Sequence, residues 1–249
     1  MGVNTRELVL DILLALEREE DYSHRLMKAV LDKYDYLEAR DKAFIKRTAE
    51  GTLERRLELD YYLEQHSSVP VRKMRPLIRC LLRMSAYQLC YMDAVPDSAV
   101  CNEACKLAAR RGFGKLKGFV NGILRTISRN KENLPLPDRE KEPIYHDSVK
   151  YSTPEWLVGL WTERYGREMT ETLLEGLMAV HRVSLRFALH VSADRREQLC
   201  GMMAEKGISA ERSPYLPYVY LLEHMEGAEA LPGFREGLCT IQDISSVLA

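Results

Sequence analysis

The stretch that decides the fold is Pro76–Met92, which reads PLIRCLLRMSAYQLCYM. Apolar residues occupy almost every face of the helix that this stretch predicts, and a helix that is hydrophobic all round lies buried among other elements. On both sides of it, apolar residues recur with the three- and four-residue spacing of amphipathic helices, and no strand pattern interrupts them before residue 130. The first 130 residues are therefore predicted to form an all-α bundle around this central helix.

The other helices of the bundle are predicted from apolar periodicity and from the residues that start or stop helices. The first helix begins near Asn4 or Thr5, and its core face carries Leu8, Val9, Ile12, Leu13 and Leu16. Further helices are expected at about 23–33, 38–51, 57–65, 97–110 and 115–129.

Prolines change the pattern after residue 130. Pro135 and Pro137 cannot continue a helix, so residues 131–150 are predicted to be a linker. A small α+β domain is predicted for residues 151–240, with two short helices divided at Gly166, strands at about 183–191, 218–222 and 238–241, and a helix over 193–206. Residues 241–249 contain a helix cap and only one apolar turn, which is typical of the start of another domain. We therefore expect this sequence to be a front region that is cut before a further domain.

Charge is unevenly distributed along the chain, although the formal net charge is only −1. Residues 1–130 contain 23 Lys and Arg against 18 Asp and Glu, whereas residues 151–249 contain 9 against 14. Within residues 101–130 there are seven basic residues and one acid, Glu103. A negatively charged partner is therefore expected at the first half, and at a local surface of it.

The strongest basic cluster lies at the last predicted helix of the bundle. Cations and glycines share one side of this helix, opposite its apolar face: Lys115, Gly118, Gly122, Arg125 and Arg129. Two glycines between cations leave a shallow surface that a phosphodiester backbone can approach, and phosphate contacts by Lys and Arg supply most non-specific affinity for nucleic acids. The alternative is an ordinary solvated helix face. We predict RNA contacts for Arg110, Arg111, Lys115, Lys117, Arg125 and Arg129.

A second set of predicted RNA contacts consists of Lys42, Lys46 and Arg47. The neighbouring acids Glu38 and Asp41 dilute the positive charge of this cluster.

A column of arginines at spacings of three and four residues is interpreted differently. It consists of Arg72, Arg75, Arg79 and Arg83. The preceding segment offers Glu58, Asp60 and Glu64 as partners, so we expect these arginines to form ion pairs within the chain.

The sequence contains no motif that indicates catalysis. The glycine-rich segment 112–115 follows a helix rather than a strand, and it matches neither the dinucleotide-binding pattern nor the P-loop pattern. The six histidines are scattered, and none of the six cysteines forms a CxxC. Cys101 and Cys105, one helical turn apart, are a conceivable metal pair, but free cysteines usually behave as small buried apolar residues. We predict no catalytic, cofactor-binding or metal-binding residue in this chain.

Neither a membrane span nor a signal peptide is predicted. No apolar run approaches the ~18 residues needed to span a bilayer. Charges at Arg6 and Glu7 fall where a signal peptide would be apolar. The expectation is a cytoplasmic protein without a membrane partner.

Several motifs of the first half resemble the NusB-type helical fold. They are Arg40–Phe44, Gly51–Leu53, Val95-Pro96, Asn102–Ala104 and Phe119–Arg125. The last of these contains V-N-x-x-L-R, which resembles the Sun/RsmB family of small-subunit ribosomal RNA cytosine-5 methyltransferases, where this fold is fused to a catalytic domain. The antitermination factor NusB, which has the fold alone, typically carries an acid where Arg125 stands.

The second half resembles the same methyltransferase family. Tyr151–Leu157 looks like the family's segment between linker and catalytic domain, and Gly237–Ser246 is similar to its G-x-x-x-x-Q-D-x-S-S signature. Leu185-Arg186 resembles the family's L-R-x-N, but Ala188 replaces the asparagine, which weighs against a role for this loop. Because the matches cover essentially the whole chain, it is identified as the front region of such a methyltransferase.

The resemblance implies RNA binding rather than catalysis. The family's S-adenosyl-methionine loop and its two catalytic cysteines are expected beyond Ala249, so the cofactor is assigned to the parent enzyme and not to this chain. The implied partners are small-subunit ribosomal RNA and the parent's own catalytic domain. The alternative is a stand-alone antitermination factor that binds RNA and protein, which predicts an end near residues 130–140. A helical interaction module with no RNA partner is a third, simpler hypothesis.

Overall fold

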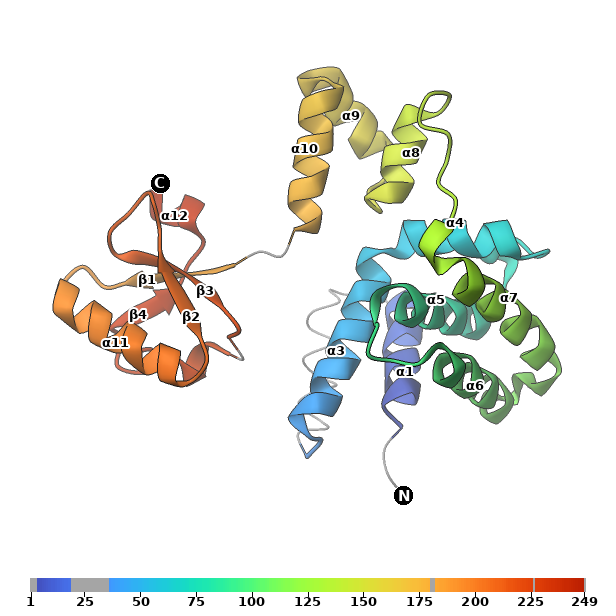
Figure 1. The fold of residues 1–249 in the computed structure, drawn as a ribbon, viewed down its shortest axis with the longest axis horizontal. Helices are drawn as coiled ribbons and strands as arrows, with labels where there is room; N and C mark the ends of the chain where they lie inside the picture. The colour runs from blue at the N-terminus through green and yellow to red at the C-terminus, as the bar shows by residue number, and fades with distance from the viewer. Residues whose placement is uncertain (1–3, 19–35, 180–181, 226, 249) are drawn as a thin grey trace. The chain divides into compact units, whose positions relative to one another are not determined.

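The computed structural model describes residues 4–18, 36–179, 182–225 and 227–248 (Figure 1). These residues form two compact units, Met1–Met178 and Ala179–Ala249. The helix predicted at about 23–33 lies outside the described residues. The predicted fold class, a mainly helical bundle followed by a small α+β unit, is confirmed.

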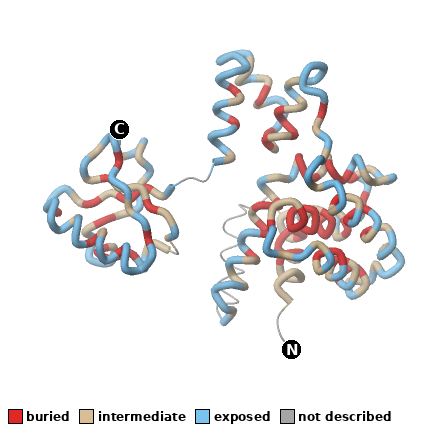
Figure 2. The backbone as a smooth tube through the Cα atoms, viewed as in Figure 1, coloured by how far each residue is buried: buried red, intermediate tan, exposed pale blue. Residues whose placement is uncertain are grey.

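The bundle of the first unit is built around one central helix. Its helices are α1 (Thr5–Arg18), α3 (Ala39–Glu54), α4 (Arg56–His66), α5 (Pro76–Tyr91), α6 (Asp97–Ala108) and α7 (Lys117–Asn130). Helix α5 contacts α1, α3, α4, α6 and α7. Most of its residues are buried, as Figure 2 shows. The sequence of α5 explains this position, because Ile78, Leu81, Leu82 and Met84 are all at most 1% exposed.

A tight turn connects α6 to α7. It consists of a π-helical turn, η2 (Ala109–Phe113), and a 3₁₀ turn, η3 (Gly114–Leu116). Gly112 has φ +88°, a left-handed conformation that glycine adopts without a steric penalty. This turn sets the position of the basic residues on either side of Gly112.

The helical unit extends beyond the bundle, contrary to the prediction of a linker over 131–150 and a new domain from 151. Its last helices are α8 (Pro143–Lys150), α9 (Glu155–Tyr165) and α10 (Arg167–Met178). Helix α8 packs against α4, where the rings of Tyr61 and Tyr145 meet edge to face at 6.0 Å. The backbone N–H of Leu57 also donates to Ser152 Oγ at 3.0 Å. Helix α8 was missed because eight residues contain too few turns for a periodicity argument, and Pro143 starts the helix rather than ending it.

The second unit is a four-stranded antiparallel sheet in the order β2-β3-β1-β4. Its elements are β1 (Val183–Phe187), α11 (Ala193–Glu205), β2 (Ser209–Arg212), β3 (Val219–Glu223), β4 (Cys239–Ile241) and α12 (Ile244–Leu248). Leu185 and Phe187 of β1 are fully buried and share a core with Leu199 and Met203 of α11. Since successive side chains of a strand alternate between faces, Arg186 points to the other face of the sheet. The strands predicted at about 183–191 and 238–241 are present in shortened form, the one predicted at 218–222 is shifted by one residue, and β2 was not predicted.

No helix in the described ranges is long and apolar enough to cross a membrane. Within the same ranges, no three residues among His, Cys, Asp and Glu come together in a way that could hold a metal ion.

Candidate nucleic-acid interface

Helix α7 has two distinct faces. Val120, Ile123, Leu124 and Ile127 are at most 4% exposed and anchor the helix to α5 and α6. The opposite face is solvent-exposed and carries the predicted basic residues. The anchoring fixes the orientation of the helix, so the exposed face keeps one geometry.

Four predicted RNA contacts are exposed: Lys115 lies in η3, just before α7, and Lys117, Arg125 and Arg129 lie on α7. Among the residues that the structure describes, no acid forms an ion pair with any of the four. Asn121 Oδ1 accepts a hydrogen bond from Arg125 Nε at 3.1 Å, which orients the guanidinium on the helix surface. We call these four cations together with Asn121 the α7 basic face.

Two glycines keep the α7 basic face open. A Cβ atom placed on Gly118 or Gly122 would meet no heavy atom within 4 Å, so the surface above both glycines is unobstructed. Phosphate oxygens can therefore approach the helix backbone between the cations.

Two acids near the α7 basic face, Glu103 and Asp97, are already paired, whereas Glu132, three residues after Arg129, is exposed and forms no ion pair with a described residue. Glu103 accepts from Lys106 Nζ at 2.7 Å. Asp97 accepts from Ser128 Oγ at 2.7 Å and from Lys131 Nζ at 3.1 Å. Burial alone would raise the pKa of Asp97, but these two hydrogen bonds hold it below its usual value. The positive potential at the α7 basic face is thus not cancelled by these two carboxylates.

Arg110 and Arg111, which the sequence also assigned to RNA, are engaged with α1. Arg110 pairs with Glu7 at 2.8 Å, and Arg111 pairs with both Glu7 and Asp11. The hydrogen bond from Arg110 is the largest influence on Glu7 and lowers the pKa of its carboxyl group. An RNA ligand would have to compete with these carboxylates for the two arginines. This pairing could not be predicted from the sequence, because about a hundred residues separate the partners.

The second predicted set of RNA contacts, Lys42, Lys46 and Arg47, lies on another helix, α3. Arg47 donates to the backbone carbonyl of Tyr91 at 3.1 Å, and Lys46 is exposed. Lys42 belongs to the same helix and is half-buried. Figure 1 shows α3 and α7 on different sides of α5, so the structure does not bring this cluster together with the α7 basic face.

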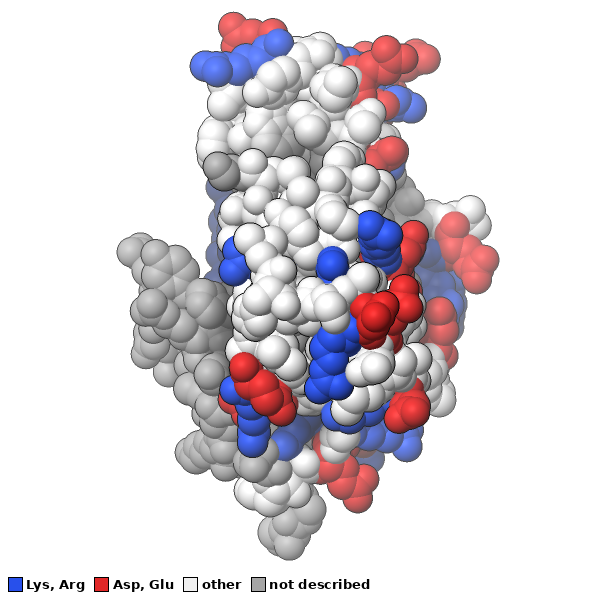
Figure 3. Space-filling model, turned by 90° about the vertical axis from the view of Figure 1, so that its left-hand side faces the viewer, with Lys and Arg blue, Asp and Glu red and all other residues white. Residues whose placement is uncertain are grey.

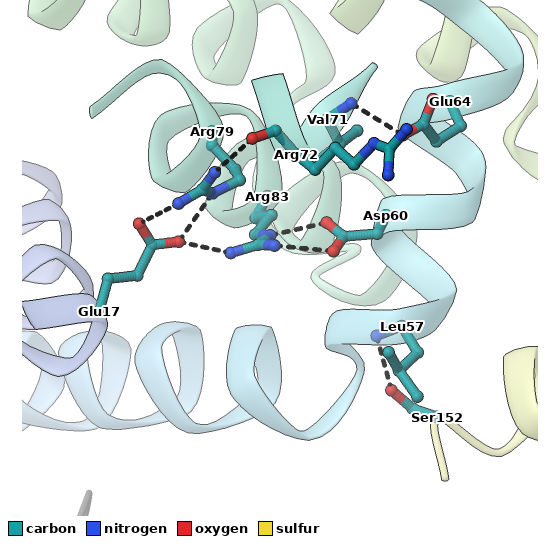
Figure 4. A network of polar contacts seen from close by, with 9 residues as sticks. All are labelled: Glu17, Leu57, Asp60, Glu64, Val71, Arg72, Arg79, Arg83 and Ser152. Atoms are coloured by element: carbon teal, nitrogen blue, oxygen red, sulfur yellow. Dashed lines mark hydrogen bonds and ion pairs between the residues drawn. The ribbon is translucent and has the colours of Figure 1, made fainter. Parts of the chain in front are cut away.

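Arg79 and Arg83, the two arginines of the column that lie on α5, form an internal network (Figure 4). Arg83 binds Asp60 through two hydrogen bonds of 2.6 and 2.7 Å and binds Glu17 at 2.7 Å. Arg79 binds Glu17 at 2.8 and 2.9 Å. The expectation of ion pairs within the chain is therefore confirmed for these two arginines.

Two of the three acids that were expected to pair with the column, Glu58 and Glu64, have other partners. Glu58 pairs with Arg55 at 2.9 Å, and Glu64 accepts from the backbone N–H of Val71 at 2.8 Å. Glu17, which the sequence interpretation did not consider, takes their place as the partner of the column. Arg72 and Arg75 are exposed.

Charge is mixed on the face of the molecule drawn in Figure 3. Basic and acidic side chains are interspersed there, and much of the described surface between them is uncharged. Such a surface creates no strong potential of one sign, in contrast to the four unpaired cations of the α7 basic face.

The fold consists of a helical bundle that ends in a basic helix and of a small antiparallel sheet unit. The protein therefore belongs to the class of helical modules that are joined to an α+β unit. The sequence model of the NusB family matches residues 3–129, about half of the chain. The chain belongs to the NusB family.

The curated relatives are similar to the chain over almost its whole length. It is 34% identical over 98% of its length to a probable ribosomal RNA small subunit methyltransferase B of Bacillus subtilis, and it covers 53% of that protein. It is 30% identical to the corresponding probable methyltransferase of Synechocystis, again over 98% of the chain and 54% of the relative. The chain thus spans about half the length of these curated relatives.

A solved structure shares the fold across both units. The crystal structure of PH0851 aligns with all of this chain and 55% of its own, with a TM-score of 0.66 and 17% identity. At that level of identity the likeness concerns the fold alone.

Proposed function

We propose that this chain is the RNA-binding front region of a small-subunit ribosomal RNA (cytosine-5) methyltransferase, and that the α7 basic face contacts the RNA. The observation that carries the proposal is the set of four exposed cations, unpaired with any described acid, around two unobstructed glycines in a chain of the NusB family. Small-subunit ribosomal RNA is the proposed partner because the curated relatives are methyltransferases of that RNA by name.

The similarity beyond the bundle supports this proposal over an antitermination factor. An antiterminator that consists of the bundle alone would share only the first half of this chain. The two methyltransferase relatives match 98% of it, including the sheet unit. The cytoplasm, where ribosomal RNA is made in bacteria, is the proposed location.

S-adenosyl-methionine is assigned to the parent enzyme outside this chain. An adenosyl cofactor is commonly held at a glycine-rich turn between a strand and a helix, where backbone N–H groups are free. The described connections from a strand to an α-helix are Ala188–Ser192, from β1 to α11, and Gln242-Asp243, from β4 to α12, and neither contains a glycine. These residues do not fit the cofactor, so we propose that a part of the parent enzyme outside this chain binds it and performs the methyl transfer.

A charge-reversal experiment tests the RNA contact. The variant Lys115→Glu with Arg125→Glu changes two exposed residues, whereas Lys73→Glu with Arg75→Glu makes the same charge change at two exposed residues near the start of α5. Binding of a small-subunit ribosomal RNA hairpin is measured by fluorescence anisotropy at several salt concentrations.

The first variant should lose about tenfold or more in affinity at moderate salt. Its plot of log K against log salt should be shallower by about 1.4–1.8, because each phosphate contact contributes about 0.7–0.9 to the slope. The control should bind within about twofold of the wild-type chain. Equal losses in both variants would mean that only net charge matters, and the α7 basic face would then have no specific role.

A further inference from the structure

Arg186 occupies an unusual position in the middle of the sheet unit. It belongs to β1, which lies between β3 and β4, and its neighbours in register are Val219 on β3 and Thr240 on β4. Strand alternation directs its side chain away from the core formed by Leu185 and Phe187. A cation is thus held at the centre of the sheet rather than at its edge.

The guanidinium of Arg186 lacks a partner among the residues that the structure describes. Its Nε is buried and makes no hydrogen bond, and no described acid forms an ion pair with it. Arg182 of the same unit, by contrast, forms ion pairs with Glu211 and Glu223. A buried donor without a partner is costly, and native proteins rarely leave one unless a ligand or an ion satisfies it.

A hollow of about 360 Å³ opens at this position. It is lined by Arg186, Ala188, Phe234, Gly237, Cys239 and Thr240. Of these side chains only Arg186 carries a charge at neutral pH, because burial raises the pKa of the Cys239 thiol to about 11. The Thr240 hydroxyl has no hydrogen-bond partner among the described residues and can donate. The hollow therefore offers the guanidinium of Arg186 and the hydroxyl of Thr240 as donors, and no carboxylate in its lining competes for them.

We propose that this hollow binds a phosphate group of the RNA backbone, as a second contact point on the sheet unit. The inference rests on the proposed RNA-binding function and deepens it. The planar guanidinium offers parallel N–H donors that match two phosphate oxygens, and Thr240 can donate to the same group. A neutral ligand would leave the charge of Arg186 uncompensated, whereas a phosphodiester supplies one negative charge.

The charge of the sheet unit limits how such a contact works. This unit has no excess of basic residues, so it should not attract RNA from a distance. The hollow instead adds a short-range contact to RNA already attracted by the α7 basic face, and this contact should affect dissociation more than association.

The test combines nuclear magnetic resonance with RNA binding in the full chain. The Arg186 Nε–Hε signal is followed during titrations with inorganic phosphate, acetate and chloride at matched ionic strength, and with the ribosomal RNA hairpin. RNA affinity is measured for Arg186→Met, for the nearly isosteric Thr240→Val, and for the control Arg195→Met on the exposed surface of α11. Thermal unfolding verifies that each variant is folded.

We expect phosphate and RNA to shift the Arg186 signal, and chloride to leave it unchanged. Arg186→Met should weaken RNA binding about three- to tenfold and lower the salt slope by about 0.7–0.9, as expected for one lost phosphate contact. Thr240→Val should weaken binding less, and Arg195→Met should have no effect.

The outcomes separate this inference from the proposed function. If the wild-type chain binds RNA but neither the Arg186 signal nor the affinities of the two variants change, the inference is wrong and the function stands. If acetate shifts the signal more than phosphate does, the hollow serves a protein carboxylate and the inference is wrong. If phosphate shifts the signal while RNA neither binds nor shifts it, the proposed function and the inference both fail. Should Arg186→Met unfold, Thr240→Val decides.

Discussion

The variant Arg83→Met tests whether the network of Figure 4 stabilises the bundle. Arg83 makes three short hydrogen bonds to two carboxylates, and its side chain is only 12% exposed, against 26% for Asp60. Exposed ion pairs contribute about 0–1 kcal/mol, and removing one partner of a fully buried pair costs about 3–5 kcal/mol. This network lies between these limits, so the free energy of unfolding should fall by about 2–3 kcal/mol. For a unit of this size the melting temperature should fall by about 4–12 °C.

Urea unfolding monitored by helical circular dichroism measures the change. The matched control is Arg75→Met, the same substitution at an exposed position of the column, which should stay within about 0.5 kcal/mol of the wild type. The reasoning fails if Arg83→Met is as stable as this control.

The same network predicts a pH dependence. Burial alone would raise the pKa of Glu17, but the hydrogen bond from Arg79 and the charges of Arg79 and Arg83 hold it below its usual value. A carboxyl group with a lowered pKa in the folded state stabilises the fold above its unfolded pKa of about 4.3, and this contribution is lost as the pH falls through the folded pKa. Replacing Glu17 by Gln should therefore lower the free energy of unfolding at pH 7, and the difference from the wild type should shrink below about pH 4.

Two further predictions concern the core. A Cβ atom on Gly51 would lie 2.1 Å from Tyr87 Cζ, so Gly51→Ala should cost about 1–3 kcal/mol in urea unfolding, and Tyr87→Leu in the same chain should recover part of the loss; an unchanged midpoint would contradict this close approach. Burial raises the pKa of Cys80 to about 12 and that of Cys239 to about 11, so iodoacetamide at pH 8 should modify these thiols only after denaturation, as counted by mass spectrometry.

The parts of the fold that could be predicted were those with a strong local pattern. Helix α5 begins at the predicted residue and ends one residue early, because a long, fully apolar helix has few alternative structures. Strand β2 was missed because Ser209–Arg212 has no apolar alternation, and it forms only by pairing with β3. The boundary between the two units was also misplaced, since the packing of α8 on α4 is a tertiary contact without a local signal.

The candidate site was predictable only in part, for the same physical reason. Local sequence is sufficient to place Arg125 opposite the apolar face of its helix, whereas Lys115, predicted on the same helix, lies in η3 just before it. It does not reveal which cations find carboxylates elsewhere in the chain, as Arg111 does with Asp11 and Arg79 does with Glu17. The unsatisfied Arg186 in the sheet unit likewise depends on which residues meet across three strands.

Lysine footprinting of the unmodified chain tests the central claim most directly. The chain is acetylated briefly with and without a small-subunit ribosomal RNA hairpin, and the modification of each lysine is measured by mass spectrometry. The account predicts that RNA slows the modification of Lys115 and Lys117 several-fold, while the exposed Lys73 near the start of α5 reacts at the same rate in both samples. Equal protection of all three lysines, or protection of Lys73 alone, would contradict the assignment of RNA binding to the α7 basic face.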